Sequence, residues 1–296
     1  MFYFLCLVKQ SGGIWTILKN RSTSKRLVRR NSDFFFVFKI KFVILVIMRI
    51  VCISDTHSLH KLMKHELPKG DVLIHAGDIS NRGGEVDVTN FIYWFQNIQG
   101  FDTKIFISGN HDYCFERVNQ PHHKGDYDWL NNLMAPENLA QSDVYYLEDN
   151  FMIIERPEFS QPIKIYGSPW QPWFYDWAFN LERLGKELEE KWLMIPEDTD
   201  VLISHTPPNG VLDLVNNWRQ PNVNVGCELL RFHVERVKPA LNVFGHIHEG
   251  YGVKQVDETL FVNASICNPG YDPTNKPIVI DLTEVDGKII ANYVEE

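Results

Sequence analysis

Short apolar runs that end in side chains able to bind a metal are the feature of this sequence that most restricts its fold. Five such runs occur after residue 48. Continuously apolar segments of this length are typical of strands that are buried on both faces of a sheet. They lie at residues 49–53, 72–76, 104–107, 201–203 and 241–244. The pattern therefore predicts buried strands that deliver polar residues at their carboxyl ends.

The segments between and after these runs predict the fold class. Helix-like segments lie at residues 85–98, 181–192 and 227–237. Later apolar runs, without a helix between them, lie at residues 260–262, 277–282 and 288–293. This order predicts one α/β domain with a mixed central sheet, or two stacked sheets, flanked by helices. In open α/β sheets, ligands bind outside the carboxyl edge of the strands, so functional residues are expected there.

The polar residues that follow the apolar runs form a candidate metal site. Its members are Asp55, His57, Asp78, Asn110, His205, His246 and His248. Asp55 and His57 are two residues apart, so extended backbone would point both side chains the same way. The same argument applies to His246 and His248. Seven ligands without a thiolate exceed the needs of one four-coordinate zinc ion, which favours two divalent cations bridged by a carboxylate such as Asp78.

Two divalent cations carry more positive charge than Asp55 and Asp78 neutralise. The surplus suits a phosphate oxygen and an activated water, so a phosphoester is the expected substrate. Among the remaining histidines, His75 is expected to be a hydrogen-bonded core residue. Surface or packing positions are expected for His60, His65, His122, His123 and His233.

The polar motifs occur in an order that resembles the calcineurin-like metallophosphoesterases. They are D-T-H at 55–57, G-D at 77–78, G-N-H-D at 109–112, S-H at 204–205 and G-H-I-H at 245–248. Further segments are similar to the metallophosphoesterase-domain branch (MPPED-type, class III phosphodiesterases): GSPWQPWF at 167–174, HTPP at 205–208 and GHIHEGYG at 245–252. The resemblance covers residues 49–283.

This resemblance implies a four-layer αββα sandwich of the metallo-dependent phosphatase type, with the site at one edge of the sheets. It implies one metal bound by Asp55, His57, Asp78 and His248, and a second bound by Asp78, Asn110, His205 and His246. Asp78 would bridge the two ions. His111 would lie outside the coordination shell, near the phosphate, to stabilise charge or protonate the leaving oxygen. Asp78 and His111 are thus the expected catalytic residues.

Substrate contacts are expected from Asn110, His111 and Arg82. Many relatives carry an aspartate three residues after the bridging aspartate to orient the histidine, whereas this chain has Asn81. A neutral amide would orient an imidazole without raising its basicity. Arg82 is equally well interpreted as an exposed turn residue.

The expected activity is that of a metal-dependent phosphoesterase, with a phosphodiesterase preferred. It would hydrolyse a small phosphoester, such as a nucleotide or cyclic nucleotide, with a water activated by two metal ions. Manganese is the preferred ion, with iron or zinc as alternatives. The alternative functions are a low-turnover nucleotide-binding or scaffold protein on the same fold, and a protein phosphatase.

An aromatic segment lies between the metal-site motifs. It contains Trp170, Trp173, Phe174, Tyr175, Trp177 and Phe179. One interpretation is that a ring stacks on a nucleobase. Packing of the segment over the site is the preferred interpretation, because Pro169 and Pro172 stiffen it.

The charge of the chain divides it near Met48. The net charge is −9, but residues 1–47 carry +8 and residues 48–296 carry −17. We interpret residues 1–47 as a basic extension outside the fold, with a transit peptide as the alternative, and residues 48–296 as the metallophosphoesterase domain. No membrane span is expected at residues 34–53, because charged residues interrupt this segment and its longest uncharged run, 42–48, is far shorter than the roughly 20 residues that cross a bilayer.

The acidic part of the chain disfavours a stable nucleic-acid partner, because binding a duplex requires a basic face. Five scattered cysteines without a C-x-x-C pair indicate a reducing compartment, so a cytoplasmic location is expected. The expected partner is a small-molecule phosphoester, and the sequence leaves the oligomeric state open.

Overall fold

The computed structural model describes residues 6–9, 15–18, 47–117, 126–215 and 222–295. The chain divides into two compact units, Met1–Val43 and Ile44–Glu296. In the first unit, β1 (Cys6–Lys9) pairs antiparallel with β2 (Trp15–Leu18). The interpretation of residues 1–47 as an extension outside the catalytic fold stays a prediction.

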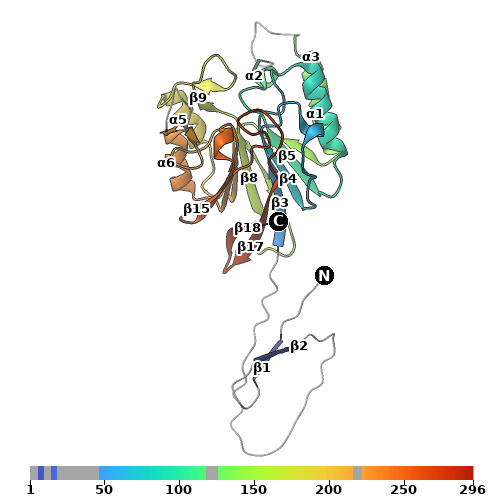
Figure 1. Cartoon of the computed structure of the whole chain (residues 1–296), viewed down its shortest axis with the longest axis vertical. Coiled ribbons are helices and arrows are strands. Elements are labelled where there is room, and N and C mark those ends of the chain that lie inside the picture. Colours follow the sequence, from blue (N-terminus) through green and yellow to red (C-terminus); the bar gives the residue numbers. More distant parts are fainter. Residues whose placement is uncertain (1–5, 10–14, 19–46, 118–125, 216–221, 296) are drawn as a thin grey trace, which may run out of the picture. The chain divides into compact units, whose positions relative to one another are not determined.

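Two six-stranded mixed sheets form the centre of the second unit (Figure 1). The first sheet has the order β18 (Lys288–Val294), β17 (Ile278–Val285), β3 (Ile47–Ile53), β4 (Val72–Ala76), β5 (Thr103–Ile107) and β6 (Val144–Tyr146). The second has the order β15 (Gly252–Val256), β16 (Thr259–Asn263), β14 (Leu241–Phe244), β11 (Val201–Ser204), β8 (Ile163–Ser168) and β7 (Asn150–Ile154). Strands β3 to β6 are parallel, as are β8, β11, β14 and β16. Antiparallel pairing adds β17 and β18 to the first sheet and β7 and β15 to the second.

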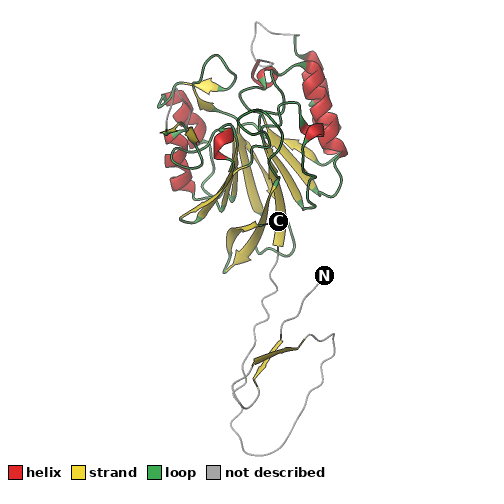
Figure 2. Ribbon diagram, in the orientation of Figure 1, coloured by secondary structure: helices red, strands yellow, loops and turns green. Residues whose placement is uncertain are grey.

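Helices cover the outer faces of the two sheets (Figure 2). The first sheet is covered by α1 (Glu85–Asn97), α2 (Tyr113–Arg117), α3 (Asp128–Leu133) and α4 (Pro136–Ala140), and the second by α5 (Lys186–Leu193) and α6 (Glu228–Val237). Short elements complete the unit: η1 (His60–Leu62), η3 (His248–Gly250), the β9 (Gln171–Pro172) and β10 (Asn180–Leu181) pair, and the β12 (Leu214–Val215) and β13 (Val223–Asn224) pair. Within the described ranges, no helix combines the length and the apolar character that a bilayer crossing requires.

Alternate residues of the central strands fill different cores. Ile50 of β3 lies in the core between the two sheets, whereas Val51 packs on the other face with residues of α1. In the second sheet, Ile203 of β11 lies in the core between the sheets and Leu202 packs with α5 and α6. Because both faces are buried, the strand sequences are predominantly apolar. The expected four-layer αββα sandwich is confirmed.

The predicted elements agree with the structure at most positions. The five apolar runs that precede polar motifs form β3, β4, β5, β11 and β14, and the three later runs form β16, β17 and β18. The helix predicted at 181–192 begins later, at Lys186, because Leu181 pairs with Pro172 in the short ladder of β9 and β10. The helix propensity of residues 181–185 alone does not show that strand pairing competes with the helix there.

Candidate metal centre

The seven predicted ligands lie together at the carboxyl ends of strands from both sheets. Asp55 follows β3, Asp78 follows β4, Asn110 follows β5, His205 follows β11 and His246 follows β14. The ligand atoms form three groups, each with its atoms within 4.8 Å of one another: Asp55, His57 and His248; His57, Asp78 and His111; and Asp78, His205 and His246. Asn110 joins the third group, because its Oδ1 lies 2.9 Å from His205 Nε2 and 2.8 Å from His246 Nδ1.

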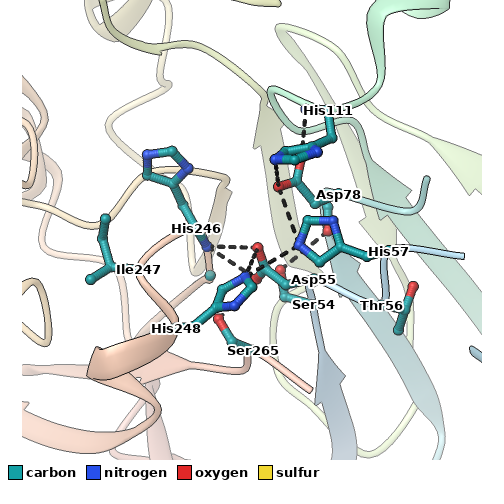
Figure 3. Close-up of polar contacts among 12 residues, drawn as sticks. Ser54, Asp55, Thr56, His57, Asp78, His111, His246, Ile247, His248 and Ser265 are labelled. Carbon is teal, nitrogen blue, oxygen red and sulfur yellow. Dashed lines mark hydrogen bonds and ion pairs between the residues drawn. The ribbon is translucent and has the colours of Figure 1, made fainter. Parts of the chain in front are cut away.

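Asp55 and His248 form one end of the site (Figure 3). Asp55 Oδ1 lies 3.4 Å from His248 Nε2, and this nitrogen lies 3.2 Å from His57 Nε2. Asp55 also accepts hydrogen bonds from Ser265 Oγ at 2.9 Å and from the backbone N–H of His246 at 3.0 Å. These bonds fix the carboxylate, and the two facing imidazole nitrogens have a spacing that suits two ligands of one ion.

Asp78 lies between the two ends of the site. Its Oδ2 is 3.4 Å from His205 Nε2 and 3.8 Å from His57 Nε2. Its Oδ1 accepts a hydrogen bond of 2.8 Å from the backbone N–H of His111. Asp78 belongs to two of the three ligand groups, which is the position that a bridging carboxylate requires.

The backbone at the ligands is not extended. Asp55, His57, Asp78 and His246 have φ values between 43° and 66°, in the left-handed region that non-glycine residues rarely adopt. The predicted extended backbone was therefore wrong. Asp55 and His57 nevertheless share one ligand group, as predicted, whereas His246 and His248 belong to different groups. Strained conformations of this kind persist where the surrounding structure holds them, as it does at functional sites.

Glycines of the motifs pack directly against the ligands. A Cβ atom at Gly109 would lie 2.5 Å from the backbone nitrogen of Asp78 and 2.6 Å from His205 Cε1. A Cβ atom at Gly245 would overlap the carboxylate of Asp55. The motifs thus need glycine at these positions because the backbone passes too close to the ligands for any side chain.

The electrostatics keep most of these groups in the form that binds cations. Burial alone would raise the pKa of Asp55, but the hydrogen bond and charge of His248 lower it below the ordinary value. Burial alone would also raise the pKa of Asp78. The charge and the hydrogen bond of His205 outweigh this effect, so the pKa of Asp78 lies well below its ordinary value. Burial lowers the pKa of His246 to about 3. At neutral pH these groups are carboxylates and a neutral imidazole, which are the states that metal binding requires.

His205 and His248 are the exceptions in the metal-free site. Burial disfavours the charged form of both, but the hydrogen bond and charge of Asp55 raise the pKa of His248. The neighbouring carboxylate of Asp78 raises the pKa of His205 to about 9. His205 therefore carries a proton at neutral pH, and a bound cation would replace that proton.

The donor set fits two divalent ions. It combines two buried carboxylates, four imidazoles and one amide oxygen, and no cysteine belongs to the ligand groups of the described residues. This mixture suits hard-to-borderline divalent cations rather than a thiolate-bound structural zinc. The two ends of the site, joined by Asp78, indicate a dinuclear divalent metal centre.

His111 belongs to the ligand group of His57 and Asp78 and is oriented by the main chain. Its Nε2 lies 4.0 Å from Asp78 Oδ2. Its Nδ1 lies 2.8 Å from the backbone carbonyl oxygen of Asn81, to which it donates a hydrogen bond. The expectation that the Asn81 side-chain amide orients the imidazole was therefore wrong. Arg82 is exposed, and its guanidinium carbon lies 5.6 Å from the centre of the Trp177 ring.

A pocket of about 450 Å³ opens beside His246. Its wall includes Trp173, Phe174 and Tyr271. Trp173 is 60% exposed and Phe174 is 48% exposed, so the preferred interpretation of a packed segment was wrong for these rings. Hydrogen bonds between the Asn180 side chain and the loop backbone hold the segment in a turn, and these two rings stay outside the core.

Sequence reasoning missed Tyr271 and Asp112. The Tyr271 ring centre lies 4.8 Å from that of His57, and nothing near Tyr271 in the sequence indicates this position. Asp112 is buried and accepts hydrogen bonds from the backbone N–H groups of Ile79 and Gly109. It thereby joins the loops after β4 and β5, and its place in the G-N-H-D motif could have indicated such a role.

Two histidines outside the metal motifs, His75 and His60, are buried packing residues. His75 is buried with its Nε2 2.9 Å from Thr56 Oγ1, which confirms the predicted hydrogen-bonded core residue. His60 is buried and packs with its ring centre 4.8 Å from that of Trp94. The positions predicted for His122 and His123 lie outside the described residues.

The sequence model of the calcineurin-like phosphoesterase family matches residues 48–250. The match covers more than half of the chain and includes every member of the three ligand groups. The chain belongs to the calcineurin-like phosphoesterase family. Membership, together with the dinuclear donor set, makes it a metal-dependent phosphoester hydrolase.

Relatives of this calcineurin-like phosphoesterase place it in the metallophosphoesterase-domain branch. Metallophosphoesterase domain-containing protein 1 of Homo sapiens is 46% identical over 79% of this chain and 71% of its own length. UPF0046 protein C25E10.12 of Caenorhabditis elegans is 36% identical over 81% of this chain and 83% of its own length. One crystal structure with 14% identity covers 84% of this chain and 99% of its own with a TM-score of 0.51, which supports the fold alone.

Proposed function

We propose that this calcineurin-like phosphoesterase is a phosphodiesterase for small phosphoesters that carry a flat aromatic group, such as nucleotides and cyclic nucleotides. The observation that carries the proposal is the pocket beside His246, because its wall includes the exposed rings of Trp173 and Phe174. Its volume of about 450 Å³ lies in the usual range for small-ligand sites. A diester fits better than a monoester, because the second substituent on phosphorus has a pocket to enter.

The proposed site holds two divalent ions. Asp55, His57, Asp78 and His248 would bind one ion, and Asp78, Asn110, His205 and His246 would bind the other. When bound, the ions would activate water and neutralise charge on the phosphoryl oxygens. Manganese is the preferred ion because the ligands mix carboxylate, amide and imidazole, with iron and zinc as alternatives.

His111 is the proposed proton donor to the leaving oxygen. Its Nδ1 is committed to the carbonyl oxygen of Asn81, which leaves Nε2 facing the ligand groups near Asp78. A proton held at Nε2 lowers the barrier most for a substrate with a poor leaving group. Asn110 and Arg82 are proposed as further contacts of the phosphate.

A panel of metals and substrates tests the proposed reaction. The full-length chain is stripped with a chelator, supplied with manganese, iron, zinc or magnesium, and assayed on bis(p-nitrophenyl) phosphate, p-nitrophenyl phosphate and 3′,5′-cyclic AMP. We expect turnover only with an added ion, and a higher kcat/KM for the diesters than for the monoester. Turnover that survives metal removal, or a preference for the monoester, would contradict the proposal.

Trp173→Ala tests the aromatic wall of the pocket. A stacked base contributes about 1–3 kcal/mol, so we expect kcat/KM for 3′,5′-cyclic AMP to fall about tenfold. Ribose 3′,5′-cyclic phosphate has the same ester ring but no base and no other aromatic group for the pocket. Its kcat/KM in Trp173→Ala should therefore stay close to that of the wild type. An equal loss of kcat/KM on both substrates would show that Trp173 contributes only to the packing of the protein.

A further inference from the structure

The Trp177 ring lies almost flat on the imidazole of His111. The two ring centres are 4.1 Å apart, and the ring planes make an angle of 27°. On His111 itself, the Nδ1 hydrogen bond to Asn81 holds one edge of the ring. The hydrogen bond and the stacked indole therefore restrain different rotations of the same imidazole.

The loop that carries Trp177 is tied to the segment that carries His111. The backbone N–H of Ala178 donates a hydrogen bond of 3.0 Å to the carbonyl oxygen of Asn110, next to His111. Tyr113 Oη donates one of 2.9 Å to the carbonyl oxygen of Asp176. Because bonds on both sides of Trp177 end on residues beside His111, the two rings are held in one local unit.

His111 needs such a restraint on the side away from the metal ligands. The ring centre of His57 lies 4.6 Å from that of His111 with an interplanar angle of 74°, and the His111 side chain is 13% exposed. Trp177 is itself half-buried, with the guanidinium of Arg82 against its ring. The indole thus covers a catalytic imidazole that no carboxylate orients at position 81.

We propose that Trp177 is a positioning residue that holds the imidazole of His111 with Nε2 facing the reacting phosphoester. The role rests on the proposed function, in which His111 protonates the leaving oxygen. The stacked ring acts together with the backbone carbonyl oxygen of Asn81, which holds the Nδ1 edge of the imidazole.

Leaving-group dependence separates positioning from a general structural role. In Trp177→Leu, we expect kcat for 3′,5′-cyclic AMP, which expels an alkoxide, to fall about tenfold or more. The kcat for bis(p-nitrophenyl) phosphate, whose leaving group needs no proton, should change less than about threefold, with KM of both substrates unchanged. Trp177→Phe should recover most of the lost kcat, because a phenyl ring can still stack. Tyr175→Asn removes an exposed ring from the same loop and should match the wild type on both substrates.

A second readout observes the geometry without turnover. In metal-free, 13C-histidine-labelled protein, the Cε1–H signal of His111, assigned with His111→Gln, should carry a ring-current shift from Trp177. We expect this shift to vanish in Trp177→Leu and to remain in Tyr175→Asn.

The outcomes distinguish this inference from the proposed function. If the wild type turns over no phosphoester with any ion, the proposed function fails and the positioning role fails with it. Two results with an active wild type would overturn the positioning role alone. In the first, Trp177→Leu keeps full kcat on the cyclic nucleotide. In the second, its kcat falls by the same factor on both substrates. An unchanged His111 signal in Trp177→Leu would overturn it as well.

Discussion

Asp78→Ala is expected to abolish hydrolysis and metal retention together. Asp78 Oδ2 lies near both His57 and His205, and Asp78 is the carboxylate shared by two ligand groups. Its loss therefore removes a ligand from both ends of the site and leaves buried imidazoles without the charge that balances them. Ion content after desalting, measured by mass spectrometry, should fall from about two per chain to background, and kcat should fall to the rate without enzyme.

A control carboxylate makes this result specific to the site. Asp87 lies in the first turn of α1 and belongs to no ligand group of the described residues. Asp87→Ala should keep both the ions and the activity. If Asp78→Ala retained two ions, or if both variants lost them, the bridging assignment would be wrong.

Gly109→Ala is expected to damage the site as severely as loss of a ligand, although it removes no polar atom. The new methyl group would meet the backbone nitrogen of Asp78 at 2.5 Å and Cε1 of His205 at 2.6 Å. The backbone of Asp78 cannot move away without breaking the hydrogen bond between the backbone N–H of His111 and Asp78 Oδ1. We expect activity below a hundredth of the wild type, consistent with misplaced ligands, and a loss of about 3 kcal/mol in the free energy of unfolding.

Gly84→Ala is the matched control for the glycine. A Cβ atom at Gly84 meets nothing within 4 Å, and Gly84 precedes the first turn of α1. Activity should stay unchanged, with a loss of less than about 1 kcal/mol in unfolding free energy by urea denaturation. Wild-type activity in Gly109→Ala would show that the loops after β4 and β5 are less tightly joined than their contacts indicate.

The ligand set could be predicted from the sequence because each ligand follows a strand with two buried faces. Both faces of β4 are packed, so all its residues except His75 are apolar and the change to Gly77 and Asp78 is abrupt. Strand β7 gives no such signal. It is an edge strand on which Phe151 and Ile153 are exposed, and its run of apolar residues leads to no ligand of the site.

The geometry inside the site depends on contacts that the sequence does not contain. The left-handed backbone of Asp55 and His57 is imposed by tertiary contacts such as the backbone hydrogen bond from the Asp55 N–H to Gly77. His111 uses the main-chain carbonyl of Asn81, which every residue type provides, so the identity of residue 81 was a misleading guide. The position of Tyr271 beside His57 is a contact between segments that lie far apart in the chain.

Anomalous X-ray diffraction from crystals of the manganese-loaded chain, recorded on both sides of the manganese absorption edge, is the most direct test of the dinuclear centre. We expect two anomalous peaks, one beside Asp55 and His248 and the other beside Asn110 and His246, with the carboxylate of Asp78 between them. A single peak, or peaks away from these side chains, would contradict it.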